Sequence, residues 1–321
     1  MNAVFILGLF IVISIIIAFA IGANDETFST IYGSKTLKMR EVLILAVIFA
    51  ILGAFFLGRA VSETVGNSIL YIETTHQIVV TILISTAIWL IISSAFKLPI
   101  STTHATIGGI IGVGLFLGGM DGLNWSTILY MGIWWLLSPV IGFVVTYVTY
   151  KLIHKFIINK LSGLKDFERV EKRFSYILLA VICLTAFSRA GNDTSNAVGI
   201  IVGVGGVNIN LALFMTGLSL ASGIVILGRG VIKNVGTLTE LRPSTAFASE
   251  VPTAVILFVG TLQGIPLSGS HMLVASLVGL SKAQHSPMSK GLWKIILIWF
   301  LTFPMAAFLA ILLFFPVGLF L

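Results

Sequence analysis

Two Asn-Asp pairs in strongly apolar surroundings are the residues of this chain best suited to chemistry. Asn24-Asp25 and Asn192-Asp193 lie 192 − 24 = 168 residues apart in a chain of 321. A carboxylate near the centre of a membrane helix costs about 2.5–3.5 kcal/mol, so two of them indicate a binding role more than an architectural one. Their amide and carboxylate oxygens suit a small hard cation, and Thr194 adds a hydroxyl oxygen. Each Asp could also cap a half-helix, which is compatible with ion binding.

Small residues beside both pairs predict that the helix is broken at each of them. Gly22 and Ala23 precede the first pair, and Gly191 precedes the second. A broken helix would offer free backbone carbonyls to the same cation. Ser195 and Asn196 extend the polar cluster of the second copy.

A second repeated pattern, Pro-x-Ser-x-x-His, occurs at residues 99–104 and again at 266–271. Proline and a hydroxyl residue ahead of an apolar run are typical of a helix start, whose unpaired N–H groups and positive dipole end attract anions. Two such starts could hold one tetrahedral anion from both sides, although plain capping of two core helices is the alternative. The residues at these starts are Ser101, Thr102, Thr103, Ser268, Gly269 and Ser270.

Five further polar residues have less definite roles. For His104 and His271, a neutral imidazole bonded inside its own half is favoured over a ligand or a proton carrier. Arg189 is either an anion contact or a partner of Asp193, and Glu250 is interpreted as polar lining. Glu26 follows Asp25 directly, has no acidic counterpart in the second copy, and receives no role.

The composition places these residues in an all-α, polytopic membrane protein. Mean hydropathy is +1.09, and only 10% of residues are charged, against roughly 25% in soluble domains. We therefore expect the outer surface of the protein to contact the lipid bilayer. The net charge of +7 does not indicate nucleic acid, because the basic residues gather in loops. The chain reads as a multi-pass protein of the cell membrane, and its sequence leaves a homo-oligomer open.

The chain also looks duplicated. Besides the Asn-Asp and Pro-x-Ser-x-x-His patterns, Gly58-Arg59-Ala60-Val61 is echoed by Gly228-Arg229-Gly230-Val231, and all three matches keep one order at offsets of 167–170 residues. We therefore expect a first repeat at 1–150 and a second at 176–321, with about five hydrophobic segments each.

Loop charge predicts that the two repeats are inverted. The loop after the first Asn-Asp segment carries Lys35, Lys38 and Arg40, whereas its counterpart at 204–210 is uncharged. A basic linker, 151–175, joins the repeats, so the positive-inside rule places it in the cytoplasm and both termini outside.

Residues 76–118 and 251–281 each form a pair of apolar segments around a Pro-x-Ser-x-x-His turn. We favour re-entrant helical hairpins over full spans, because polar turn residues need a cavity and not lipid. Lys97, at the first turn, would then have to reach water.

Together the motifs resemble the duplicated signature of the inorganic phosphate transporter (PiT) family, which comprises sodium- or proton-coupled phosphate permeases. The matching segments are Gly22-Ala23-Asn24-Asp25, Ala190-Gly191-Asn192-Asp193-Thr194-Ser195-Asn196-Ala197 and both Pro-x-Ser-x-x-His turns. The resemblance covers the whole chain, and the short linker is similar to that of prokaryotic members.

This resemblance implies phosphate symport, inverted repeats and both termini outside. It implies phosphate binding at the two helix starts together with Asn24 and Asn192. It implies sodium binding, with protons as the alternative, at Asn24, Asp25, Asn192, Asp193 and Thr194. The first copy departs from the family at Glu26-Thr27-Phe28, where small residues and another Asn are usual, so no ligand role is carried over to 26–28.

We expect import of phosphate with sodium by alternating access, and no enzyme activity. The nearest alternative is a proton-coupled permease for phosphate or a metal–phosphate complex. A more distant one is an intramembrane enzyme, either an aspartyl protease with Asp25 and Asp193 as its dyad or a lipid phosphotransferase. A dyad would need neither an Asn beside each Asp nor duplicated helix starts.

Overall fold

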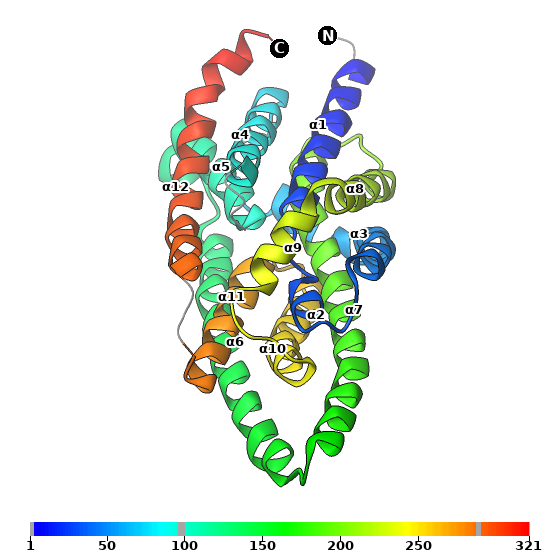
Figure 1. Ribbon diagram of the computed structural model, residues 1–321. Coiled ribbons are helices and arrows are strands. Elements are labelled where there is room, and N and C mark those ends of the chain that lie inside the picture. Colours follow the sequence, from blue (N-terminus) through cyan, green and yellow to red (C-terminus); the bar gives the residue numbers. More distant parts are fainter. Residues whose placement is uncertain (1–2, 96–99, 287–289, 321) are drawn as a thin grey trace.

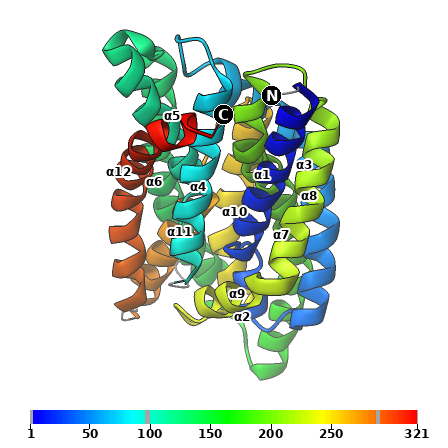
Figure 2. The same ribbon diagram turned by 90° about the horizontal axis from the view of Figure 1, so that it is seen from above.

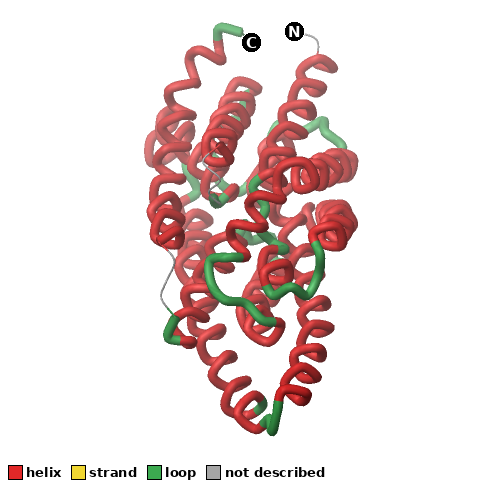
Figure 3. Tube along the Cα trace, in the orientation of Figure 1, coloured by secondary structure: helices red, strands yellow, loops and turns green. Residues whose placement is uncertain are grey.

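The computed structural model describes residues 3–95, 100–286 and 290–320, and helices dominate this part of the chain (Figures 1 and 3). In order they are α1 (Ala3–Ala23), α2 (Ser29–Gly33), α3 (Met39–Asn67), α4 (His76–Ala95), α5 (Thr102–Gly118), the 3-10 turn η1 (Gly119–Gly122), α6 (Trp125–Phe156), the 3-10 turn η2 (Ile158–Lys160), α7 (Leu164–Val202), α8 (Ile209–Gly223), the π-helical turn η3 (Ile224–Gly228), α9 (Arg229–Gly236), α10 (Pro243–Leu262), α11 (Gly269–Gln284) and α12 (Lys290–Gly318).

Eight of the described helical segments are long and apolar enough to cross a membrane. The apolar part of α4, His76–Ile92, is shorter. Large hydrophobic side chains such as Phe56, Leu136 and Phe300 are exposed on the outer helices, as expected where lipid replaces water. The prediction of an all-α, polytopic membrane protein is confirmed.

Helices from one half of the chain pack against helices from the other half. α1 packs along α8 and α3 along α7, and these four lie side by side in Figure 2. Likewise α12 packs on α4 and α5, while α6 packs on α10 and α11. Each pairing therefore has a counterpart when α1 is matched with α7, α3 with the segment α8–α9, α4 with α10, α5 with α11 and α6 with α12, as a duplicated chain predicts. The boundaries at residues 150 and 176 stay a prediction.

The segment expected as a linker is largely helical. Residues 151–156 complete α6, η2 follows, and α7 begins at Leu164. Figures 1 and 2 show this turn at one end of the molecule, whereas α1 begins and α12 ends toward the opposite end. An odd number of crossings in each half places the chain in this way.

Only one of the two expected helix breaks is present in the described residues. α1 ends at Ala23 and α2 begins at Ser29, but α7 continues through Asn192-Asp193 to Val202. The glycines serve close helix packing instead: a Cβ on Gly22 would collide with the Leu220 carbonyl of α8, and one on Gly191 with the Leu57 side chain of α3. Small residues allow such backbone approach between membrane helices.

α4 pairs with α5, and α10 pairs with α11, as two helical hairpins. In Figure 1 the first hairpin lies toward the end that holds the termini, and the second lies toward the α6–α7 turn. Their tips meet, because Thr103 Oγ1 donates to the Leu267 carbonyl at 2.9 Å and Ser270 Oγ donates to the Ile100 carbonyl at 3.2 Å. Lys97 and Pro99, on which part of the hairpin prediction rests, lie outside the described residues.

Candidate functional site

The two Pro-x-Ser-x-x-His turns start helices α5 and α11 through equivalent serine caps. Ser101 Oγ accepts from the His104 N–H at 3.1 Å, and Ser268 Oγ accepts from the His271 N–H at 3.3 Å. Each serine thereby satisfies one of the N–H groups that a helix start leaves unpaired. In the opening turns of these helices, the side chains of Thr102, Thr103 and Ser270 are buried.

Asn24 and Asn192 tie each Asn-Asp segment to the hairpin tip of its own half. The Ile100 N–H donates to Asn24 Oδ1 at 3.3 Å, and the Leu267 N–H donates to Asn192 Oδ1 at 3.1 Å. Asn192 also donates from Nδ2 to the Ile265 carbonyl at 3.0 Å. The expected phosphate and sodium residues are therefore brought together, with both amide oxygens already accepting backbone hydrogen bonds.

The two aspartates have different neighbours. Asp25 Oδ1 accepts from the Thr27 N–H at 2.7 Å and from the Thr27 hydroxyl at 2.5 Å. Asp193 Oδ1 instead accepts from the Thr102 hydroxyl at 3.2 Å, at the start of α5. Asp193 thus contacts the hairpin tip of the first half directly.

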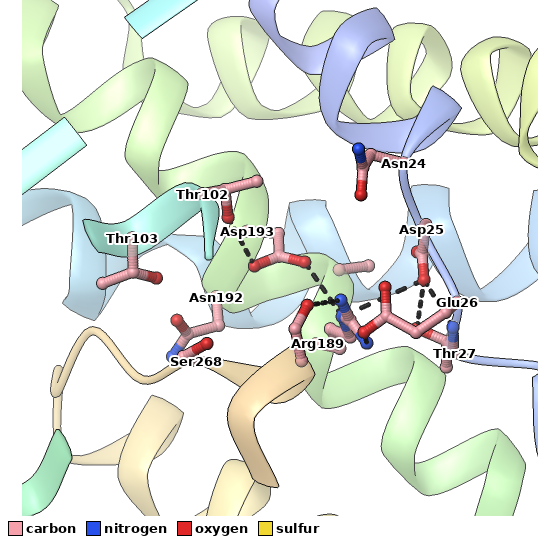
Figure 4. A network of polar contacts seen from close by, with 12 residues as sticks. Asn24, Asp25, Glu26, Thr27, Thr102, Thr103, Arg189, Asn192, Asp193 and Ser268 are labelled. Carbon is pink, nitrogen blue, oxygen red and sulfur yellow. Dashed lines mark hydrogen bonds and ion pairs between the residues drawn. The ribbon is translucent and has the colours of Figure 1, made fainter. Parts of the chain in front are cut away.

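Arg189, one turn before Asp193 on α7, lies at the centre of the polar network (Figure 4). Its guanidinium forms an ion pair with Glu26 Oε1 at 2.7 Å, with Asp193 Oδ2 at 3.1 Å and with Asp25 Oδ1 at 3.9 Å. Arg189 Nη2 also donates to Ser270 Oγ at 2.9 Å. The sequence left two roles open for Arg189, and the structure shows the contact with Asp193.

Charge in this network is not balanced when all its groups are ionised. One guanidinium and three carboxylates sum to 1 − 3 = −2, and all four side chains are at most 8% exposed. Buried charges interact several-fold more strongly than charges in water. Bound cations or protons are needed to offset the excess. No set of three or more Asp, Glu, His or Cys side chains in the described ranges has the geometry of a metal site; the Arg189 guanidinium lies among the three acids instead.

Thr194, expected as a sodium ligand, bonds within its own helix. Its hydroxyl donates to the Ala190 carbonyl at 2.6 Å, and Ser195 Oγ donates to the Gly191 carbonyl, also at 2.6 Å. Asn196 reaches the hairpin tip, with Nδ2 donating to Thr103 Oγ1 at 3.2 Å.

The sequence assigns no role to Glu26 and predicts only polar lining for Glu250. Glu250 is fully buried on α10 and accepts from the Thr30 hydroxyl at 2.6 Å and the Thr185 hydroxyl at 3.3 Å. A carboxylate in an apolar run needs a buried polar partner. Both glutamates stand within apolar runs of the sequence, so the need for a buried partner could be predicted. The sequence does not identify the partner.

His104 and His271 contact each other across the two halves of the chain. Their ring centroids are 4.5 Å apart, with Trp135 against His104 and Trp299 against His271. Neither Nε2 atom has a hydrogen-bond partner among the described residues. The favoured interpretation of an imidazole bonded inside its own half is not seen at these atoms.

Comparisons with known proteins show the family and the fold of this chain. Residues 21–310 match the family described as the phosphate transporter family. The chain is 26% identical to "Putative phosphate permease TK2061" of Thermococcus kodakarensis, over 95% of this chain and 96% of that protein. It is 23% identical to "Inorganic phosphate transporter 2-1, chloroplastic" of Arabidopsis thaliana, over 92% of this chain and 69% of that protein.

One solved structure has the same fold along almost the full length. It is described as "The sodium-dependent phosphate transporter", and it superposes with a TM-score of 0.90 at 25% sequence identity. The match covers 98% of this chain and 100% of that one. These relatives are transporters and permeases, not enzymes.

Proposed function

The chain belongs to the phosphate transporter family, and we propose that it imports inorganic phosphate together with sodium by alternating access across the cell membrane. The observation that carries this proposal is the meeting of two helix starts beside buried carboxylates. α5 and α11 begin at hairpin tips that bond to each other, and Asp193 bonds to the first of these tips.

Phosphate is assigned to the two tips. The proposed donors include the opening N–H groups of α5 and α11. The hydroxyls of Thr102, Thr103 and Ser270 donate to Asp193, Leu267 and Ile100 in this structure, and they would turn to the anion when it binds. Ser101 and Ser268 hold the turns, and Gly269 lets an oxygen approach the backbone. Helix starts with free N–H groups are general anion-binding sites, and pairing two of them suits a tetrahedral oxyanion.

Sodium is assigned to the Asn-Asp segments. A carbonyl oxygen has two lone pairs, so Asn24 and Asn192 can each accept a backbone hydrogen bond and still face a cation. Asp25 and Asp193 supply the charge, and the Thr194 oxygen is the fifth proposed ligand. Without cations the carboxylates would repel the phosphate across a low-dielectric site, so neither ligand binds well alone and their transport is coupled.

Alternating access follows from two inverted repeats, 1–150 and 176–321, with the 151–175 linker in the cytoplasm and both termini outside. Support comes from the matched helix pairings and from hairpins that lie toward opposite ends of the molecule (Figure 1). Transporters of this type rock one repeat against the other around a site at their interface.

The carboxylates also predict selectivity against sulfate. Phosphate at neutral pH keeps at least one P–OH group that can donate to an aspartate, whereas sulfate has none. We expect phosphate uptake to be unchanged by about a hundredfold molar excess of sulfate. A ratio of affinities of that order is typical when a site hydrogen-bonds one ligand and not the other. Strong competition by sulfate would contradict the proposed contact between phosphate and a carboxylate.

Radiolabelled phosphate uptake into proteoliposomes tests the function. An inward sodium gradient without a pH gradient should drive accumulation, and a pH gradient without sodium should not. Accumulation driven by the pH gradient alone would favour the proton-coupled alternative, and a requirement for divalent cation would favour a metal–phosphate complex. No accumulation under any gradient, in vesicles shown to be sealed, would refute transport.

A further inference from the structure

Arg189 and Glu26 are charged residues of the two Asn-Asp segments that break the internal symmetry of the site. At the offset of 168 residues, Arg189 corresponds to Ile21 and Glu26 corresponds to Thr194. Each charge thus occurs in one copy only, yet the two meet across the halves at 2.7 Å with side chains 6% and 0% exposed. Two unpaired charges would be very costly at these positions, so the pair is a unit.

The Arg189 guanidinium lies at the start of α11, where the anion is expected. Arg189 Nη2 donates to Ser270 Oγ at 2.9 Å. Gly269 makes room for it, since a Cβ there would come within 3.0 Å of both Arg189 Cδ and Nε. A positive charge beside the positive end of a helix is unfavourable by itself. An oxyanion between them would be favourable to both, and a guanidinium binds phosphate through two parallel hydrogen bonds.

In the present structure the same guanidinium faces carboxylates that are also proposed to attract the cations. Its Nε contacts Asp193 Oδ2 at 3.1 Å and its Nη1 contacts Glu26 Oε1 at 2.7 Å. The second Glu26 oxygen, Oε2, is fully buried and has no hydrogen-bond partner among the described residues. A buried oxygen of this kind keeps its capacity to accept from a further cationic or donating partner.

We propose, building on phosphate–sodium symport, that Arg189 is a phosphate ligand and that Glu26 and Asp193 withhold it until cations bind. Sodium and the guanidinium compete for the same carboxylate oxygens. When sodium neutralises these oxygens, the guanidinium turns to the phosphate at the tips of α5 and α11. When sodium leaves, the carboxylates take the guanidinium back and phosphate loses a ligand. Arg189 thereby links cation occupancy to anion affinity within one side chain.

Equilibrium binding to the purified full-length protein tests this switch, with 32P-phosphate titrated at fixed sodium and 22Na titrated without phosphate. Arg189→Gln should weaken phosphate binding at saturating sodium about tenfold or more. The same variant should tighten sodium binding, because the competing cation is gone. Glu26→Gln should strengthen phosphate binding at low sodium, since Arg189 is held less firmly. The opposite signs separate a switch from a purely structural ion pair, whose loss would weaken both ligands.

A matched control is the exposed pair Arg59–Glu63, with side chains 64% and 50% exposed. Arg59→Gln and Glu63→Gln should change neither isotherm. Unchanged phosphate affinity in Arg189→Gln, or weakened sodium binding, would overturn the proposal. If Arg189→Gln does not fold, Glu26→Gln decides, because unaltered or weaker phosphate binding at low sodium would contradict the switch. A wild-type protein that binds no phosphate at any sodium concentration would instead refute the proposed function itself.

Discussion

The two Asn-Asp segments carry the same residue pair, yet one interrupts its helix and the other does not. In both, the asparagine accepts a hydrogen bond from the hairpin tip of its own half. In the first, Asp25 accepts from the N–H of Thr27, two residues on, and this local turn competes with the helix. In the second, Thr194 and Ser195 donate to carbonyls four residues back, and α7 continues. Because the pair is the same in both segments, the difference in the backbone comes from its surroundings.

The two aspartates therefore have different contacts in the site. Asp25 holds its own loop, whereas Asp193 joins Arg189 to the tip of α5. The duplicated asparagines are equivalent anchors, and the asymmetry of the site lies in the acids and in Arg189. Variants at matched positions can therefore separate what the two halves share from what differs.

The largest effects are expected from the aspartates. Asp193→Asn and Asp25→Asn should each abolish sodium-driven phosphate uptake in proteoliposomes, because each removes a charge that offsets the cation. Uptake at the wild-type rate in either variant would remove the cation role of that residue. Glu63→Gln is the control for loss of an exposed carboxylate.

The asparagine anchors should come next. Asn24→Ala and Asn192→Ala each leave a buried backbone N–H of a hairpin tip without its acceptor, which costs about 1–3 kcal/mol. Denaturant unfolding in detergent, compared with uptake, measures both consequences. We expect a similar loss in the two variants if the anchors are equivalent. A loss of stability and uptake in only one of the two variants would show that the asparagines are not equivalent anchors.

The smallest effect is expected at Thr27. Thr27→Val removes the hydroxyl that bonds to Asp25 but keeps the Thr27 N–H bond, so the loop should persist with a cost of about 1 kcal/mol. Ser222→Ala, at an exposed serine of α8 that bonds to its own helix, is the control. A change in sodium affinity of Thr27→Val larger than that of Asn24→Ala would contradict the ranking.

Local chemistry made much of the fold predictable. Hydropathy gave the membrane helices, and Ser101 and Ser268 marked the starts of α5 and α11 because a hydroxyl before an apolar run is a local cap signal. The loop at residues 24–28 was foreseen from Gly22, although that glycine serves packing against Leu220. The same reasoning was wrong for Gly191, which lies within the continuous α7 and packs against Leu57 of α3.

The contacts of Glu26, Arg189 and the two histidines could not be predicted in this way. Glu26 and Arg189 are separated by 189 − 26 = 163 residues, and nothing in the sequence near either one names the other. His104 and His271 meet only because the hairpins enter from opposite ends and touch at their tips. Such pairs depend on how the two halves are docked, which periodicity and capping signals do not encode.

The central claim is that the two hairpin tips hold one oxyanion while the neighbouring aspartates hold the cations. The most direct test is an experimental structure with sodium and arsenate, whose anomalous signal locates a phosphate analogue. We predict one arsenate within hydrogen-bond distance of both Thr102 or Thr103 and Ser270, with sodium against Asp25 and Asp193. Arsenate bound elsewhere, or bound at the tips equally well without sodium, would contradict the account.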